Sequence, residues 1–356
     1  MKKALVAMSG GVDSAVAALL LKGDGYDLTG ITMRLWDASA RVPDEKLCAP
    51  DENATEAKKI ADELGFPHLT TALGETFYKN VIEKFISDYR SGKTPNPCVE
   101  CNKTLKFGAL FDIADELSIP YLATGHYAKI EKDSSGEYRL LKAADPNKDQ
   151  SYFLWCIKKE RLSKILFPLG DYTKPEIREI AASHGFCNAS RSDSQDICFI
   201  PDGDYVSFIR SVDKSGEGFQ RGNFVDVSGN ILGRHEGIIR YTVGQRKGLG
   251  IALGRPIFVG GKSVTDNTVT LCSDRELYKR ELTATGINLL IDDTLEAPAR
   301  VEAKIRYRHT AAPATVRRIG EDRLMLCFDE PQRAITAGQS LVLYDGERVI
   351  GGAIIE

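Results

Sequence analysis

The feature that most constrains this chain is a glycine turn close to residue 1. The sequence SGGVDS at residues 9–14 follows an apolar, strand-like run and precedes a helical pattern over residues 14–22. Adjacent glycines let the backbone approach an anion without Cβ atoms in the way, and the N–H groups and dipole of the following helix favour negative charge. The turn has neither the lysine of a Walker loop nor the three glycines of a dinucleotide loop. It predicts a phosphate site of another kind, although a plain strand-to-helix turn capped by Asp13 or Ser14 would also fit.

Strand and helix patterns alternate along the first half of the chain. Residues 2–8, 28–33 and 121–124 have the character of buried strands. Helical spacing of apolar residues or helix-capping signals are found at residues 14–22, 54–64, 77–89, 104–117, 173–184 and 202–212. This alternation predicts an α/β domain with a parallel, doubly wound sheet, and residues 127–143 read as an inserted hairpin.

From about residue 213 the pattern changes to dense glycine and short β-branched runs. Strands at regular spacing are predicted at residues 282–289, 300–307, 314–319, 323–328, 340–344 and 348–355, which favours a small antiparallel β-barrel. We therefore expect three domains: the α/β domain with the glycine turn at 1–212, a small β-rich linking domain at 213–280, and a C-terminal barrel at 281–356.

Charge is distributed unevenly along the chain. The chain as a whole has a formal net charge of −3, but residues 234–255 and 300–323 each carry a net charge of +4. Such segments are typical of a surface that binds a polyanion, and equally of ordinary solvated strand faces.

No membrane or export signal is evident. The longest purely apolar run, residues 15–21, has seven residues, against the roughly 20 needed to cross a bilayer. Lys2 and Lys3 precede an apolar stretch that is too short for a signal peptide. The expectation is a soluble, cytoplasmic protein with no membrane partner.

Two of the eight cysteines stand apart from the rest. Cys98 and Cys101 lie among polar turn formers after two prolines, so we expect a rigid, exposed loop that leads into a helix. Cys101 would sit near the helix N-terminus beside Lys103 and Lys106, where dipole and cations lower a thiol pKa. A redox pair or half of a zinc site are the alternatives, but zinc takes four ligands and Cys187 and Cys198 complete a set poorly.

Cys198 has apolar neighbours and on its own could be a buried core cysteine. Its other possible use depends on the SGGVDS turn, which resembles the loop of ATPases that adenylate a substrate oxygen. Such a loop and two thiols, Cys101 and Cys198, would suffice for sulfur insertion. Adenylation turns a carbonyl oxygen into a good leaving group, a persulfide sulfur attacks the carbon, and a second thiol frees the product.

The complete SGGVDS motif resembles the loop of pyrophosphatase-loop ATPases, which split ATP between its α and β phosphates. It is followed in order by NPCVECNK with LKFG, ATGHYA, KDQSYFL, DSQDICFI, YTVGQRKGLGI and IRYRH. On these motifs residues 2–356 resemble the tRNA-specific 2-thiouridylases, which thiolate C2 of the wobble uridine in the tRNAs for lysine, glutamate and glutamine.

The resemblance implies roles for particular residues. Cys101 would be the nucleophile, and Cys198 would carry the persulfide and form a transient disulfide with Cys101. ATP, with Mg²⁺ expected alongside it, would bind at Ala7, Met8, Ser9, Gly10, Gly11, Val12, Asp13, Ser14, Met33 and Gly125. The target base would meet Asn96, Pro97 and Cys98, and tRNA would contact His126, Lys148, Asp149, Gln150, Arg306, Tyr307 and Gln339. No resident metal site is implied.

The resemblance also implies two partners: tRNA, and a sulfur donor that is either a persulfide-carrying relay protein or a cysteine desulfurase. One position departs from the family pattern. Many members have Asp where this chain has Cys98, and a thiol is a weaker and differently tuned acid/base group than a carboxylate. Cys98 is thus open to three roles: base contact, substitute acid/base or spare thiol.

Two other functions remain open. A small-molecule ligase of the same loop class would also adenylate its substrate, but it would need neither paired cysteines nor basic C-terminal strands. A non-catalytic RNA-binding protein with a relic ATP site would need neither an intact loop nor both cysteines.

Overall fold

The computed structural model describes residues 1–35, 50–186, 197–251 and 254–356. The chain divides into two compact units. The first comprises Met1–Val81, Cys98–Gly203 and Glu347–Ile350, and the second comprises Ile82–Pro97, Asp204–Gly346 and Gly351–Glu356. None of the helices in the described ranges combines the length and apolar character that crossing a membrane requires.

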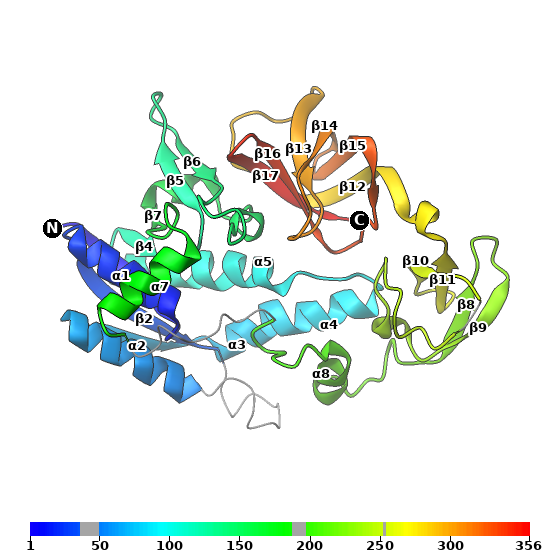
Figure 1. Cartoon of the computed structure of the whole chain (residues 1–356), viewed down its shortest axis with the longest axis horizontal. Helices are drawn as coiled ribbons and strands as arrows, with labels where there is room; N and C mark the ends of the chain where they lie inside the picture. The colour runs from blue at the N-terminus through cyan, green and yellow to red at the C-terminus, as the bar shows by residue number, and fades with distance from the viewer. Residues whose placement is uncertain (36–49, 187–196, 252–253) are drawn as a thin grey trace. The chain divides into compact units, whose positions relative to one another are not determined.

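The first unit is built on a five-stranded sheet with the order β3-β2-β1-β4-β7 (Figure 1). Every neighbouring pair in it is parallel, which confirms the predicted parallel sheet. The strands are β1 (Lys3–Ala7), β2 (Asp27–Arg34), β3 (His68–Ala72), β4 (Tyr121–Ala123) and β7 (Ile165–Leu166). Of these, β3 and β7 were not expected.

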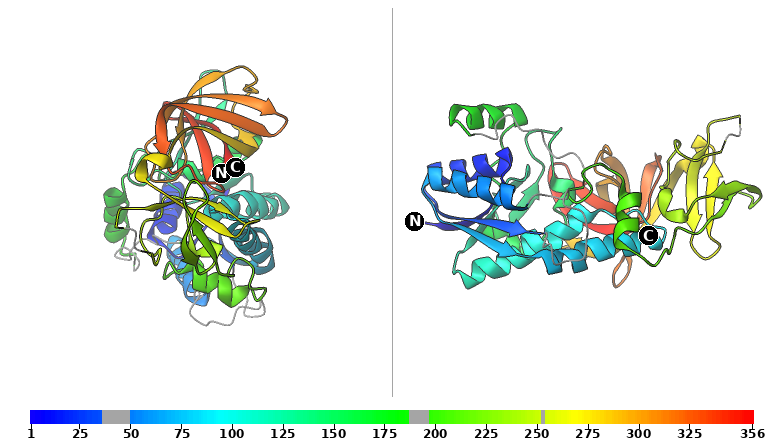
Figure 2. Two further views of the ribbon diagram at one scale, coloured as in Figure 1. Left: turned by 90° about the vertical axis from the view of Figure 1, so that its right-hand side faces the viewer. Right: turned by 90° about the horizontal axis from the view of Figure 1, so that it is seen from below.

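Helices pack on this sheet through small and branched apolar residues. Ala4 and Val6 of β1 share one core cluster with Val16, Ile60 and Ile177, from α1 (Val12–Gly23), α2 (Pro50–Leu64) and α7 (Lys174–Ser183). Both Figures 1 and 2 show α7 beside α1. Because side chains alternate along a strand, Leu5 faces the other side of the sheet.

The remaining helical segments of the first unit are α3 (Gly74–Phe77), η1 (Tyr78–Ile82, which ends in the second unit), α5 (Pro97–Cys101), η2 (Asn102–Ala109), α6 (Leu110–Glu116), η3 (Ser151–Phe153) and η4 (Lys159–Lys164).

Two local predictions in this unit are confirmed. β5 (Lys129–Lys132) and β6 (Tyr138–Leu141) form the expected antiparallel hairpin. Thr173 is the N-cap of α7, and its backbone N–H donates to the Glu176 side chain at 2.7 Å in a capping box. These features depend on neighbouring residues only, which is why the sequence pattern identifies them.

The second unit contains a small sheet and a closed barrel. The small sheet has the order β10-β11-β8-β9 and is formed by β8 (Gly222–Val225), β9 (Ile231–His235), β10 (Phe258–Ser263) and β11 (Thr268–Cys272), with η5 (Ile238–Arg240) and η6 (Asp274–Leu277) nearby in the chain. The barrel runs β12-β15-β14-β13-β16-β17 and closes through antiparallel pairing of β12 with β17. Its strands are β12 (Tyr278–Leu289), β13 (Ala299–Lys304), β14 (Ala312–Gly320), β15 (Arg323–Arg333), β16 (Ser340–Asp345) and β17 (Arg348–Ile355). The predicted antiparallel barrel is confirmed.

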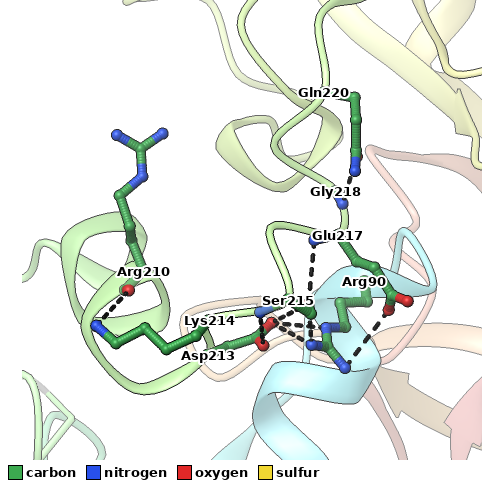
Figure 3. Close-up of polar contacts among 8 residues, drawn as sticks. All are labelled: Arg90, Arg210, Asp213, Lys214, Ser215, Glu217, Gly218 and Gln220. Carbon is green, nitrogen blue, oxygen red and sulfur yellow. Dashed lines mark hydrogen bonds and ion pairs between the residues drawn. The ribbon is translucent and has the colours of Figure 1, made fainter.

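The segment Ile82–Pro97 belongs to this second unit although it lies early in the chain. Its helix α4 (Glu83–Arg90) packs on α8 (Tyr205–Val212), with the rings of Tyr89 and Tyr205 stacked at 4.6 Å between centroids. Arg90 Nε donates to Asp213 Oδ2 at 2.7 Å, and its guanidinium also contacts Ser215 and lies 3.5 Å from Glu217 (Figure 3). One arginine thus joins α4 to the chain that follows α8.

Candidate functional site

The glycine turn connects β1 to α1 in a tightly closed form. Gly10 has a φ of +72°, and a Cβ there would lie 2.7 Å from the Asn53 carbonyl oxygen, so only glycine fits. The Ser14 hydroxyl donates to the Gly11 carbonyl oxygen at 2.9 Å and accepts from the Ser9 N–H at 3.2 Å. The N-cap residue of α1 is Gly11, which has no side chain that could cap the helix. The first N–H groups of α1, which have no partner inside a helix, can therefore face an anion.

The turn lies where the sheet changes its direction of connection. From β1 the chain builds outward through β2 and β3, and β4 then returns to the other side of β1. Open α/β sheets bind ligands at such a switch point, outside the carboxyl ends of the strands. Gly125, two residues after β4, touches the turn: a Cβ on it would lie 2.9 Å from Ser14 N. Met33, near the end of β2, shares this edge.

A buried lysine completes the turn. Lys174 Nζ lies 2.8 Å from both carboxylate oxygens of Asp13, and its side chain is only 7% exposed. The Tyr127 hydroxyl donates to Asp13 Oδ1 at 2.7 Å. The Lys174 N–H donates to Asp145 at 3.1 Å, which fixes the start of α7. The Asp13 carboxylate is thus held by a cation and a phenol at the mouth of an anion site.

Sequence reasoning did not assign Lys174 or Tyr127 to the site. Lys174 stood out only as part of a capping box, and Tyr127 only as part of the ATGHYA motif. Lysine is rarely buried unless it is paired, but its partner here is 161 positions away. The residues next to Lys174 in the sequence therefore do not indicate that it is buried and paired with Asp13.

The cysteine pair lies at the start of one continuous helical run. α5 begins at Pro97, so Cys98 is in its first turn and Cys101 ends it, before the π-helix η2. Cys98 is exposed, whereas Cys101 is 9% exposed. The predicted helix is present, but Cys101 lies a turn further from its N-terminus than expected.

The expectation that the pKa of Cys101 is lowered is wrong. Burial raises the pKa of the Cys101 thiol above the usual range, and the Lys106 ammonium opposes this only in part. Although Cys98 is exposed at the surface, desolvation of its thiol by the surrounding protein atoms raises its pKa against the effect of Lys106. The free protein therefore holds both thiols mainly protonated at neutral pH.

The other cysteines in the described ranges are also free thiols. Cys198 is exposed, which contradicts the alternative of a buried core residue. Of the five remaining cysteines, Cys156 and Cys272 are buried and Cys327 is half-buried, whereas Cys48 and Cys187 lie outside the described residues. The alternative of a zinc site has no support among the described residues. In that part of the chain, no three or more His, Cys, Asp or Glu side chains are grouped so that they could hold a metal ion.

Several side chains expected to contact tRNA are engaged within the first unit. Asp149 is 7% exposed and accepts from the N–H groups of Ala143 and Ser151, each at 3.1 Å. Gln150 Oε1 accepts from the Tyr127 N–H at 3.0 Å, and Lys148 beside them is half-buried. Both Asp149 and Gln150 therefore shape the loop after the hairpin.

His126 is also engaged. It is 9% exposed, and its ring nitrogens contact Thr124 Oγ1 at 2.7 Å and Lys106 Nζ at 3.3 Å. Burial, and then the nearby Lys106 charge, hold the pKa of His126 well below 6.5. The imidazole is neutral at physiological pH.

Residues of the second unit behave similarly. Gln339 Nε2 donates to the Thr94 carbonyl oxygen at 2.8 Å, just before Asn96 and Pro97. Arg306 donates to the Arg333 carbonyl oxygen at 2.9 Å, and Tyr307 beside it is half-buried. In this state Gln339 holds the backbone that leads to the expected base-contact residues.

The basic segments are partly neutralised by acids from elsewhere in the second unit. Arg300 binds Asp329 through two nitrogens, at 2.8 and 2.6 Å, and Arg323 Nε lies 2.7 Å from Glu356. Arg308 and Arg317 stay exposed. The charge counted along the sequence therefore overstates the free positive charge of the 300–323 segment.

Three family models cover nearly the whole chain. Residues 2–202 match a model described as "tRNA methyl transferase HUP domain", residues 214–273 a PRC-barrel domain of the same series, and residues 279–355 an aminomethyltransferase β-barrel domain. A protein of Clostridioides difficile named "tRNA-specific 2-thiouridylase MnmA" is 48% identical over 356 residues, which cover all of this chain and 98% of the relative. A relative with the same name from Carboxydothermus hydrogenoformans is 43% identical over 358 residues, with 100% and 98% covered.

The chain belongs to the tRNA-specific 2-thiouridylase family. Its members are tRNA sulfurtransferases, and the resemblance drawn from the sequence motifs is confirmed. Among solved structures, a 4-thiouridine synthetase–RNA complex with bound ATP matches 59% of this chain and 50% of its own, at 21% identity and a TM-score of 0.34. A TM-score this low supports no conclusion about function, which has to come from the site.

Proposed function

We propose that this protein is an ATP-dependent tRNA-uridine 2-sulfurtransferase that acts on the wobble uridine of the tRNAs for lysine, glutamate and glutamine. The observation that carries the proposal is the combination, within one unit, of an uncapped glycine turn at the switch point of the sheet and a helical pair of cysteines. The name of the relatives supports the same reaction. The proposal includes the expected division into residues 1–212, 213–280 and 281–356, and a cytoplasmic location, where tRNA and ATP occur together.

The glycine turn would bind the phosphates of ATP. Its N–H groups and the Ser9 and Ser14 hydroxyls supply donors, and Lys174 supplies a buried cation at Asp13. Met33 and Gly125 would bracket the adenosine at the same edge. Absence of a Walker lysine favours cleavage between the α and β phosphates, with the uridine C2 oxygen taking the adenylyl group. Mg²⁺ would accompany ATP.

Sulfur would then replace the activated oxygen. The terminal sulfur of a persulfide on Cys198 attacks C2 and AMP leaves with the oxygen. Cys101 thiolate attacks the inner sulfur of Cys198, which releases the thiolated base and leaves a Cys101–Cys198 disulfide for an external thiol to reduce. A persulfide-carrying relay protein or a cysteine desulfurase would supply the sulfur.

A second candidate comes from the word "methyl transferase" in the matched family description. Methyl transfer would need neither an ATP-phosphate turn nor two cysteines outside the barrel, so the site favours thiolation. A small-molecule ligase of the same loop class also remains as an alternative, since the turn by itself only implies adenylation.

One assay discriminates these functions. We expect release of pyrophosphate and AMP from ATP only when tRNA is present, and nucleoside mass spectrometry should show sulfur in place of oxygen on uridine. ADP and orthophosphate as products would contradict the phosphate assignment. A methylated base would support the second candidate, and adenylation without tRNA would favour the ligase.

Affinity for tRNA should fall steeply with salt, because each lysine or arginine that displaces a condensed counterion adds about 0.7–0.9 to the log–log slope. We expect Arg306→Ala and Arg308→Ala to weaken binding and flatten the slope in filter-binding titrations. Arg300→Ala is the matched control, since Asp329 already neutralises Arg300 in the same barrel. A slope that is unchanged in the Arg306/Arg308 double variant would remove the barrel from the tRNA-binding surface.

A further inference from the structure

Lys106 lies on the same helical run as the cysteine pair. The run starts at Pro97 as α5 and continues as the π-helix η2, Asn102–Ala109. In a π-helix the i→i+5 hydrogen bonds make residues five positions apart neighbours along the axis, about one turn apart. Lys106 follows Cys101 by five positions and therefore lies about one turn further along the same run. The electrostatic effect of Lys106 on both thiols agrees with this placement.

A neutral imidazole holds the Lys106 ammonium. Lys106 Nζ lies 3.3 Å from His126 Nε2, and His126 Nδ1 lies 2.7 Å from Thr124 Oγ1. Since a lysine only donates, Nε2 is the acceptor and the ring proton lies on Nδ1, facing Thr124. The rings of Phe107 and Phe167 lie 5.8 and 5.9 Å from the imidazole and restrict its rotation.

The charge of Lys106 is not cancelled by this arrangement. A carboxylate partner would neutralise the ammonium, whereas a neutral acceptor fixes its position and leaves the charge in place. Within the described ranges no carboxylate forms an ion pair with Lys106, and the polar partner of its ammonium there is the His126 ring. The positive charge is therefore left to act on the neighbouring thiols.

We propose that His126 is a positioning residue that holds Lys106 beside Cys98 and Cys101, so that the lysine charge stabilises the thiolate form of this pair. On ionisation the S–H bond breaks, the proton goes to water, and the Lys106 charge stabilises the thiolate that is left. The inference rests on the proposed function only for the use of the thiolate, because the reactivity of the thiols is a property of the protein without substrates. It gives His126 a role other than the direct tRNA contact implied by family resemblance.

The surroundings of Cys101 leave Lys106 as the group that favours its thiolate. Among the described residues, the charged or titratable groups that act on Cys101 are Lys106 and the Cys98 thiol, and Cys98 acts in the opposite direction. Cys156, which follows η3, does not act on the pKa of Cys101; it is itself buried, and burial raises its pKa to about 12. Lys103, the other lysine expected to act on Cys101, is exposed and acts on Cys156 instead.

The test is the pH dependence of alkylation, measured on the full-length protein without ATP or tRNA. Iodoacetamide reacts with the thiolate, and peptide mass spectrometry follows Cys98 and Cys101 separately from about pH 6 to about pH 11, a window that extends well above the ordinary thiol pKa. We expect Lys106→Met to slow alkylation of Cys101 by about three- to tenfold below the midpoint and to move the midpoint to higher pH. Lys106→Arg should restore most of the rate. His126→Leu should also slow alkylation of Cys101. The double variant with Lys106→Met and His126→Leu should react little more slowly than Lys106→Met alone.

Lys103→Met is the matched control and should leave the Cys101 profile unchanged. Raising the salt concentration should slow the wild-type reaction but not that of Lys106→Met, because screening acts only where the charge is present. Thermal unfolding of each variant checks that the helical run is intact, and Lys106→Gln provides a second neutral variant if Lys106→Met is unstable. An unchanged profile in a folded, neutral Lys106 variant would refute the proposal. A slowed Lys106 variant with a normal His126→Leu profile would refute the role given to His126.

These outcomes are separate from the proposed function. If Cys101 were not the nucleophile, its alkylation would still respond to Lys106, and thiolation of tRNA would fail for another reason. If thiolation is confirmed but alkylation ignores Lys106, the function stands and this inference does not.

Discussion

Lys174→Met should lower tRNA-dependent ATP–pyrophosphate exchange by about a hundredfold or more, the size of effect seen when one preorganised group at a developing charge is removed. The Lys174 ammonium lies 2.8 Å from both oxygens of Asp13 and is 93% shielded from water, as its 7% side-chain exposure shows. Without it, the Asp13 carboxylate would face the phosphates of ATP with no cation beside it. Repulsion between this carboxylate and the phosphates would then oppose the binding of ATP. It would also oppose the build-up of negative charge on pyrophosphate as the bond to the α phosphate breaks.

A surface pair of the same chemistry provides the control. Lys58 and Asp62 form an ion pair at 3.0 Å with side chains 60% and 59% exposed, and Lys58→Met should leave the exchange rate unchanged, because exposed pairs contribute little. Tyr127→Phe, which removes only the hydroxyl on Asp13, should have a smaller effect than Lys174→Met. Normal exchange in a folded Lys174→Met protein would show that the pairing serves stability alone.

Cys198→Ser should abolish persulfide-dependent thiolation and preserve adenylation of tRNA. The Cys198 thiol would carry the transferred sulfur, and a serine hydroxyl cannot hold it as a persulfide. Cys101→Ser should also stop product formation when a persulfide is the sulfur source, since no second thiol would then release the base. Thiolated nucleoside and AMP are quantified in the same reaction, so that adenylation and sulfur transfer are read separately.

Two further variants make this series specific. Cys327→Ser changes a half-buried cysteine in the barrel and should retain full activity. Cys98→Ser should reduce activity only mildly if the exposed Cys98 thiol is a base contact. Full activity in Cys101→Ser together with loss in Cys98→Ser would show that the nucleophile is Cys98. A trapped Cys101–Cys198 disulfide during turnover, seen by non-reducing peptide mapping, would support the proposed release step.

Sequence patterns predict this fold where the deciding contacts are local. The glycine turn, the capping box of α7 and the hairpin β5–β6 depend on residues within a few positions of one another, and all are found. β3 could not be predicted from its sequence pattern. Four of its five residues are polar or small and its side chains are half-buried or exposed, so it shows no alternation of apolar residues. β7 has only two residues.

The properties of the site residues are harder to predict from sequence patterns, because their pKa values and ion pairs depend on residues far away in the sequence. Local sequence placed Cys101 beside lysines near a helix start, which would lower its pKa, but tertiary burial reverses the direction. The pairing of Lys174 with Asp13 spans most of the first unit. The sequence also predicts that a segment around residues 188–200, rich in Ser, Asp and Asn, becomes ordered when tRNA binds; residues 188–196 of this segment lie outside the described residues.

The packing of Ile82–Pro97 determines how the C-terminal half of this protein can be studied in isolation. A fragment that starts at Asp204 would lose α4, and with it the ring stacked on Tyr205 and the guanidinium on Asp213. It would also lose the Thr94 backbone that pairs with Ala337 at 2.8 Å. Autonomous folding of this half therefore calls for the early segment to be supplied as a fused or separately added peptide, in the manner of fragment complementation.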